Sequence, residues 1–349
     1  MLPISRSIPM SPLRRSALLA ALLLAPPLLA APSPRLVSGR VFTADGGSAE
    51  GLRVFARAPG FADSAEVAPT GEFTLALPED FPAEGVELHT DAADRDRRAY
   101  HPALARLRPG DLAREPRFVL VPRTWTVPAG TYAGVRVPIS LDRAFEAPCE
   151  GCQGFYRSVR GDSVPPEARG VLGWAEEAFP LRIAFDRAGS GGPVSARDSA
   201  AFWQVVEALE EDFGRDLFRP GRLYDLRPGE DPRDLVLVWI DPSLGARGMS
   251  TQATFQGHIT TGAVWLRRAS LIRAPDGPAL VQHELMHVLG MGHTCAWRSV
   301  LSARSRCGGL DAPRPTAEDV AYGQLLLGVR ALQRRHGARW GAAAALAGE

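Results

Sequence analysis

Between residues 36 and 121 the chain alternates apolar and polar positions in short runs that are separated by turns. A period of two without helical spacing is typical of half-buried β-strands, whose successive side chains point to opposite faces. Asp45-Gly46 and Thr70-Gly71 lie between the runs and favour turns. The expected strands are 37–42, 52–56, 73–77, 86–89 and 118–121. Residues 36–121 are therefore predicted to form an all-β sandwich.

A second pattern begins near residue 175, where apolar runs alternate with segments of helical spacing. The runs that predict strands are 179–185, 234–240, 248–255 and 259–266. Apolar residues recur at helical spacing over 202–213, behind a capping signal at Ser195. Another capping signal at 316–319 predicts a final helix. We therefore expect an α/β (α+β) domain over 175–335, followed by a flexible tail at 336–349.

Residues 122–174 lie between these two regions and carry weaker signals. The short apolar runs 125–127 and 135–137 could form strands. The segment also contains Cys149 and Cys152 in polar surroundings, with C-x-x-C spacing. We expect a linker region with short strands, and the whole chain is predicted to be multidomain.

The first part of the chain, 1–31, has the features of a secretory signal peptide. Arg14 and Arg15 precede an apolar run from Ala17 to Ala30, and small residues follow. This run is shorter than the roughly 20 residues that a membrane-spanning helix needs, and prolines interrupt it. We expect cleavage near Ala31 and a mature bacterial protein that is secreted or periplasmic, without a stable membrane anchor.

The composition is that of an ordinary globular protein and narrows the class of partner. Hydrophobic residues make up 45% of the chain, charged residues 23%, and the formal net charge is +1. A chain so close to neutral has no basic excess with which to bind nucleic acid. We therefore expect no nucleic-acid partner, and the sequence leaves the oligomeric state unknown.

The strongest chemical signal is the pattern H-E-x-x-H-x-x-G-x-x-H, which begins at His283. Residues four apart share one face of a helix, so His283 and His287 can present their imidazoles to one point. His293 cannot reach that point from the same helix. Gly290 lies where the chain must leave the helix, because glycine adopts the left-handed conformation without a steric penalty. Three imidazoles leave one position of a tetrahedral Zn²⁺ open for water, and Glu284 can take a proton from that water.

This motif resembles the signature of the metzincin metallopeptidases. The resemblance implies an α/β sandwich over about 175–335, in which the strand 248–255 lies at the sheet edge and pairs with an extended peptide substrate. It also implies a turn whose methionine packs under the imidazoles. Here the equivalent position is Leu301, a side chain of similar volume. Ala303 stands where some members carry a tyrosine, so the closer likeness is to a matrix-metalloproteinase-like catalytic domain.

The N-terminal region has a resemblance of its own. Its pattern G-x-V…D-G…G-L-x-V…T-G-x-F-x-L, which starts at Gly39, resembles the prealbumin-like (carboxypeptidase-regulatory-like) domains attached to carboxypeptidases and many bacterial surface proteins. The resemblance implies a β-sandwich but no particular activity, because a fold by itself does not define a function. A folding or spacing module is the simpler expectation.

The chain has four cysteines, which allow three disulfide pairings. In an exported protein, C-x-x-C spacing favours a short disulfide over metal or redox chemistry. Cys295 and Cys307 flank the expected turn at Leu301. We favour Cys149–Cys152 with Cys295–Cys307, since the second bond would brace the floor of the metal site. The sequence leaves the other two pairings open.

Together these features predict an exported zinc metalloendopeptidase that hydrolyses peptide bonds in a peptide or protein substrate. His283, His287 and His293 would bind one catalytic Zn²⁺ ion, with Glu284 as the general base. The alternative is a catalytically silent metzincin-fold protein used for binding or adhesion. The intact Glu284 argues against that alternative, because a binding protein has no need of a carboxylate at this place.

Overall fold

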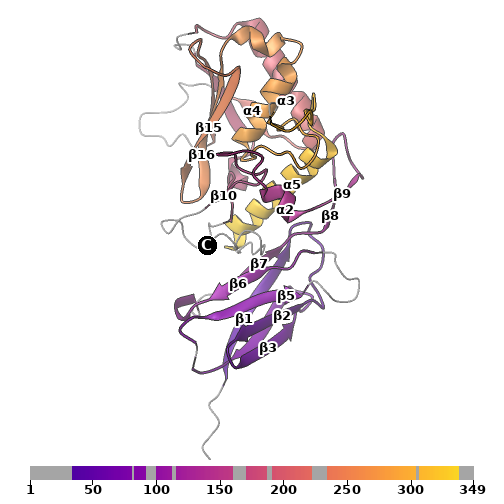
Figure 1. The fold of residues 1–349 in the computed structure, drawn as a ribbon, viewed down its shortest axis with the longest axis vertical. Coiled ribbons are helices and arrows are strands. Elements are labelled where there is room, and N and C mark those ends of the chain that lie inside the picture. Colours follow the sequence, from indigo (N-terminus) through magenta and orange to yellow (C-terminus); the bar gives the residue numbers. More distant parts are fainter. Residues whose placement is uncertain are drawn as a thin grey trace, which may run out of the picture.

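The computed structural model describes residues 34–80, 82–91, 100–111, 115–159, 170–186, 191–221, 234–303 and 306–337. Figure 1 shows two bodies along the long axis of the molecule, with the purple N-terminal strands in one and the later helices and strands in the other. The expected signal peptide at 1–31 and most of the expected tail at 336–349 lie outside the described residues.

The N-terminal body consists of two sheets and is all-β, as predicted. One sheet has the order β4-β1-β7, formed by Glu72–Leu77, Arg35–Thr43 and Arg117–Leu120. The other has the order β3-β2-β5-β6, formed by Phe61–Glu66, Arg53–Ala58, Val86–Asp91 and Leu104–Leu107. Both sheets contribute to one core, which includes Val37, Val54, Leu75, Leu88 and Phe118. Each sheet thereby buries one face against the other, as layered β folds require.

Two of these strands, β3 and β6, are not predicted from the sequence. β3 has no fully buried residue, so its sequence lacks the apolar alternation of a half-buried strand. β6 is only four residues long. Pairing with longer neighbours, β3 with β2 and β6 with β5, decides their conformation.

The second body is built on a five-stranded sheet with the order β13-β12-β14-β16-β15. In that order the strands are Phe218–Pro220, Leu181–Phe185, Leu235–Ile240, His258–Leu266 and Gly248–Phe255. β13, β12, β14 and β16 run parallel, whereas β15 is antiparallel to β16 and lies at the edge. The four strands expected from apolar runs are present, which confirms an α/β region after the all-β region.

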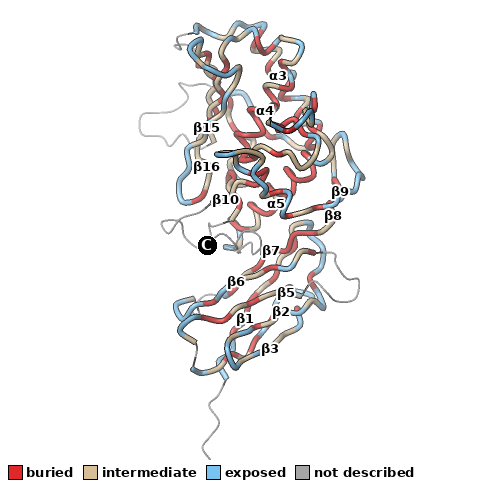
Figure 2. Tube along the Cα trace, viewed as in Figure 1, coloured by how far each residue is buried: buried red, intermediate tan, exposed pale blue. Residues whose placement is uncertain are grey.

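Three long helices share the buried core of the second body. They are α3 at Ala196–Phe213, α4 at Gly277–Val288 and α5 at Ala317–His336. α3 begins at Ser195, whose hydroxyl accepts the N–H of Asp198 at 3.1 Å, and α5 begins with a capping box between Thr316 and Asp319. Both caps lie where the sequence predicts them, and Figure 2 shows buried residues along these helices. Among the described helices, none combines the length and apolarity that a membrane crossing requires.

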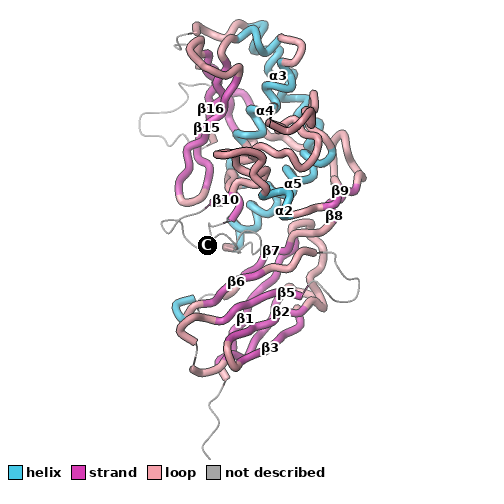
Figure 3. Tube along the Cα trace, in the orientation of Figure 1, coloured by secondary structure: helices cyan, strands magenta, loops and turns pink. Residues whose placement is uncertain are grey.

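The described parts of the segment 122–174, expected as a linker, pack into the core of the second body. They contain β8 at Thr124–Thr126, β9 at Arg136–Pro138, α2 at Leu141–Phe145, β10 at Ser158–Val159 and β11 at Gly170–Val171 (Figure 3). The Trp125 indole N–H donates to Gln324 on α5 at 3.0 Å. The Trp174 indole N–H donates to the carbonyl of Val288, at the end of α4, at 2.7 Å. The segment therefore supports two helices as well as connecting the bodies.

Candidate metal centre

Three histidine side chains converge at the end of α4. The Nε2 atoms of His283 and His287 lie 3.0 Å apart, those of His287 and His293 3.2 Å, and those of His293 and His283 3.4 Å. His287 is buried and the other two are half-buried. Nitrogen ligands grouped this closely could hold a metal ion. The structure thus brings together the three histidines that the motif singles out.

Gly290 lets the chain turn back toward the helix that it has just left. Its φ is +106°, in the region that favours glycine, as expected from the motif. A Cβ at this position would lie 2.8 Å from the carbonyl oxygen of Leu172, so a larger residue would also collide with the neighbouring backbone. Two residues on, the N–H of Gly292 donates to the carbonyl of Phe155 at 2.9 Å. This path delivers His293 to the two histidines of α4.

Backbone carbonyls determine which nitrogen carries the proton in two of these rings. Nδ1 of His283 lies 2.8 Å from the carbonyl oxygen of Val300, and Nδ1 of His287 lies 2.8 Å from that of Met291. A carbonyl oxygen only accepts, so each Nδ1–H donates and each Nε2 keeps its lone pair. Lone pairs that face one another at such short range are stabilised by a cation. The residues present therefore fit a metal ion, and the carbonyls orient its ligands.

Burial keeps two of the histidines, His287 and His293, in the neutral form that binds metals. It lowers the pKa of His287 well below 6.5, and the nearby His283 lowers it further. It lowers the pKa of His293 to about 4, again with a contribution from His283. These two rings are therefore neutral at neutral pH, and metal binding does not require them to lose a proton there.

Glu284 lies beside the three histidines and is 4% exposed. Burial raises its pKa to about 7, although a hydrogen bond from Ser250 and the charge of Arg157 act in the opposite direction. Its carboxyl group lies against β15, because a Cβ at Gly248 would be only 2.8 Å from Oε1 of Glu284. A carboxyl with a pKa near neutrality can both accept and return a proton, so Glu284 suits general acid–base chemistry.

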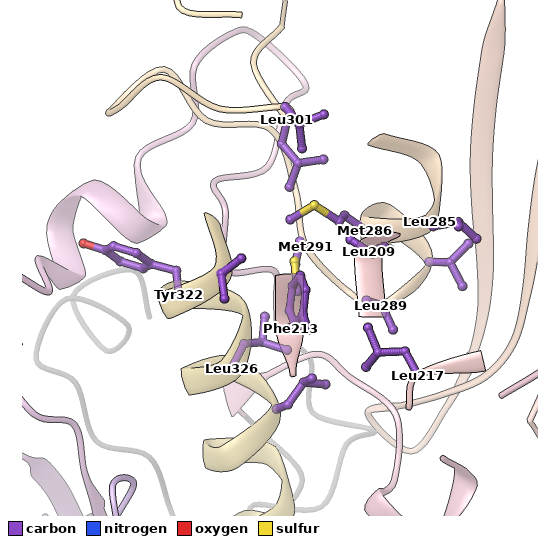
Figure 4. Packing of buried hydrophobic residues seen from close by; sticks show 14 of the residues in the cluster. Leu209, Phe213, Leu217, Leu285, Met286, Leu289, Met291, Leu301, Tyr322 and Leu326 are labelled. Atoms are coloured by element: carbon purple, nitrogen blue, oxygen red, sulfur yellow. The ribbon is translucent and has the colours of Figure 1, made fainter. Parts of the chain in front are cut away.

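The turn expected at Leu301 lies next to the metal centre. Leu301 is 0% exposed and follows Val300, whose carbonyl holds the ring of His283. Figure 4 shows its side chain at the end of a buried cluster that continues through Met286 and Met291. Leu301 therefore fills a buried apolar position one residue after the carbonyl that holds His283.

Asp319 fixes this turn, although no sequence motif connects it with the three histidines. Its buried carboxylate accepts the hydroxyl of Ser299 at 2.5 Å, the indole N–H of Trp297 at 2.9 Å and the N–H of Val300 at 3.1 Å. The sequence predicts Asp319 only as part of the cap of α5. The capping residue of one helix therefore positions the carbonyl that orients a ligand on another.

The four cysteines form the expected pairs, Cys149 with Cys152 and Cys295 with Cys307. No cysteine in the described part of the chain is free. The Cys295–Cys307 bond closes the loop that contains Leu301, and therefore restrains the backbone beside the histidines. Cys149 and Cys152 line the cleft that opens over them.

This cleft has a volume of about 870 Å³ and is continuous with the metal centre. His283, Glu284 and His293 lie in its wall, together with Gly248 at the start of β15. Arg157 lines the same cleft. The histidines and the carboxyl group are thus accessible to a molecule that enters the cleft.

Three further residues reach the site from distant parts of the sequence. Ser250 and Gln252 share the face of β15 that lies toward α4, and Ser250 donates a hydrogen bond to Glu284. Arg157 donates through Nη1 to Oε1 of Gln252 at 2.6 Å, and the Gln252 amide donates to the carbonyl of His287. The alternation along β15 is a signal that could have grouped Ser250 with Gln252. No sequence motif links either of them to Arg157.

No protein-family model, curated protein or solved structure matches this chain. Its class therefore rests on its own fold and site. An all-β region precedes an α/β region, and three histidines at the end of α4 could hold a metal ion inside a cleft.

Proposed function

We propose that this chain is an exported zinc-dependent endopeptidase with a metzincin-like catalytic domain. The observation that carries the proposal is a buried carboxyl group, Glu284, beside three converging Nε2 atoms. Nitrogen ligands at about 2.0–2.1 Å in a tetrahedron around zinc lie about 3.3 Å from one another. The Nε2 atoms of His283, His287 and His293 are 3.0, 3.2 and 3.4 Å apart, which supports an ion of this size.

The chain supplies the groups that peptide hydrolysis needs. A bound zinc ion would polarise the scissile carbonyl and lower the pKa of the attacking water. His283, His287 and His293 would hold the ion, with two backbone carbonyls keeping ring lone pairs available. Glu284 takes a proton as the water oxygen bonds to the carbonyl carbon. It then gives that proton to the amide nitrogen as the C–N bond breaks, which leaves a carboxyl group and an amine.

A peptide is the substrate class that suits this cleft. β15 is an edge strand, so one side of its backbone has no strand partner among the described residues. An extended peptide can add to such an edge through backbone hydrogen bonds. Gly248 at the start of β15 lines the cleft together with His283 and Glu284. A peptide on this edge would therefore pass over the metal centre.

We infer that the protein works outside the cytoplasm, in a secreted or periplasmic form. The inference rests on the signal-peptide features of 1–31 and on the two disulfides, because such bonds persist in oxidising compartments.

The deciding experiment measures cleavage of casein and of unstructured fluorogenic peptides, with bound metal quantified in the same preparation. We expect one zinc per chain, loss of cleavage on chelation and recovery when Zn²⁺ is restored. Cleavage that survives complete metal removal would refute the zinc mechanism. A folded, zinc-loaded protein that cleaves none of these substrates would refute the peptidase assignment and favour a binding or adhesion role.

A further inference from the structure

Arg157 is a cationic side chain in the wall of the cleft that contains the metal centre. It is half-buried, and its Nε is buried without a hydrogen-bond partner. Nη1 donates to Gln252, whereas Nη2 has no hydrogen-bond partner among the described residues. Arg157 also forms no ion pair within the described part of the chain. The guanidinium therefore keeps donor capacity that a partner in the cleft could use.

The charge of Arg157 acts on the metal centre itself. The Arg157 side chain lines the cleft together with His283, Glu284 and His293, and its Nη1 is linked through Gln252 to the carbonyl of His287. A fixed cation beside a cation-binding site weakens metal binding, so metal retention does not explain its position. A negative charge that forms in the cleft during the reaction would explain it.

Gln252 holds the guanidinium in a defined place. Its side-chain oxygen accepts from Arg157, and its amide donates to the carbonyl of His287. The Arg157 side chain is thereby connected to both β15 and α4 before any substrate arrives. Donors that are fixed in advance need little reorganisation when charge develops, and such donors contribute most to transition-state stabilisation.

We propose that Arg157 is a catalytic residue that stabilises the negative charge on the scissile carbonyl oxygen, an inference that rests on the proposed peptidase function. As the water oxygen bonds to the carbonyl carbon, the π electron pair of the C=O bond moves onto the carbonyl oxygen, and the water proton moves to Glu284. The anionic oxygen accepts a charge-assisted hydrogen bond from Nη2 of Arg157. When the C–N bond breaks, the pair re-forms the C=O bond and this hydrogen bond weakens.

The test compares R157M and R157K with wild type, using the full chain loaded with zinc. R267M is the matched control, because Arg267 is also half-buried with a buried, unpartnered Nε but does not line the cleft. We expect kcat to fall about 100-fold to 1,000-fold in R157M, the usual effect of removing one such donor. KM should change less than about threefold, metal content should stay at the wild-type value, and R157K should recover part of kcat. R267M should retain the wild-type kcat.

A second measurement does not depend on turnover. Inorganic phosphate, a tetrahedral oxyanion, is titrated into the Co²⁺-loaded protein while the visible absorption of the ion is recorded. We expect the affinity for phosphate to fall at least about tenfold in R157M and to be unchanged in R267M. If the wild-type protein binds phosphate in this way but cleaves no peptide, Arg157 is confirmed as an anion-binding residue and only the proposed peptidase function is refuted.

Three results would overturn the proposal. Equal phosphate affinity in wild type and R157M would show that Arg157 does not bind an anion there. A rise in KM confined to peptides with acidic side chains, at unchanged kcat, would make Arg157 a selectivity residue. Loss of bound metal in R157M that R157K restores would mean that the residue positions the site through Gln252.

Discussion

The carbonyl oxygen of Val300 lies 2.8 Å from Nδ1 of His283, a residue seventeen positions earlier in the chain. The N–H of Val300 is in turn held by Asp319 at 3.1 Å. The cap of α5, the turn and the first histidine therefore form one continuous series of hydrogen bonds. Because such partners orient an imidazole ring and fix its tautomer, the candidate metal centre depends on residues outside the three histidines.

Asp319→Ala should weaken metal binding and lower stability. It leaves the buried donors of Ser299, Trp297 and Val300 without their acceptor, which costs roughly 1–3 kcal/mol for each unsatisfied group. We expect metal affinity to fall about 10-fold to 100-fold, measured by competition with a chromogenic chelator. Asp198→Ala is the control, because Asp198 belongs to the N-terminal cap of α3. Asp198→Ala should lower stability and leave metal affinity unchanged. An equal loss of metal affinity in both variants would show that the hydrogen bonds from Asp319 through Val300 do not orient His283.

Glu284→Gln should retain the metal and lose turnover. Glutamine keeps the shape of the side chain but cannot accept and return the proton, so kcat should fall about 10²-fold to 10⁴-fold. Without metal the pKa of Glu284 is about 7, and a bound cation lowers it. The wild-type rate should therefore fall as pH decreases through a value below 7, where the base becomes protonated. A variant with full activity, or an acid limb above 7, would remove Glu284 from this role.

Metal retention should resist acid. The pKa of His293 is about 4 and that of His287 lies well below 6.5, so at these two ligands protons compete with the metal only at acidic pH, well below 6.5. Equilibrium dialysis should find constant zinc content from pH 8 to about pH 5, followed by loss. A free peptide spanning 283–293 is the control, because its exposed imidazoles titrate near pH 6.5. Release from the folded protein at the same pH as from the peptide would show that burial does not protect the ligands.

The same pKa shifts predict the pH dependence of the metal-free protein. Between pH 6.5 and 4 the unfolded chain binds protons on histidines that stay neutral when folded, so these histidines make stability fall with decreasing pH. Glu284 acts in the opposite direction between pH 4.5 and 7, because its pKa is raised on folding. The two histidines together change the free energy of unfolding more than the single carboxyl group does. Urea unfolding at pH 6.5 and pH 4.5 should show lower stability at the lower pH.

Gly290→Ala should disrupt the metal centre more than a glycine substitution elsewhere. At φ +106° an alanine is strained, and its Cβ would lie 2.8 Å from the carbonyl oxygen of Leu172. Gly308 is the control: its φ is +61°, but no atom lies within 4 Å of an added Cβ. Gly308→Ala should lower the free energy of unfolding only by the strain of an alanine in the left-handed backbone conformation, about 1–2 kcal/mol. Gly290→Ala should cost more and displace His293, seen as weaker zinc binding; equal effects would contradict this account.

The parts of the site that follow local rules could be predicted from the amino-acid sequence alone. Side chains four apart on a helix share a face, so His283 and His287 had to be neighbours once α4 formed. Gly290 was predicted to break the helix because of the conformation it alone adopts readily, and the caps of α3 and α5 were visible as short motifs. The all-β and α/β regions were likewise predicted from the periods of two and of three to four.

The distant residues that complete the site could not be predicted in this way, because they are brought together by the packing of the whole chain. Arg157 and Gln252 lie beside the histidines because Arg157 and β15 pack next to the end of α4. Asp319 acts on His283 only through Val300. No local spacing encodes this packing. The same holds for Trp125, whose burial against α5 depends on a partner about two hundred positions away, Gln324. Backbone sterics and neighbouring side chains determine local conformation. Contacts between distant residues depend instead on the burial of apolar surface, and this driving force has no preferred direction. A sequence pattern can therefore predict which residues face a core, but not which residues they meet there.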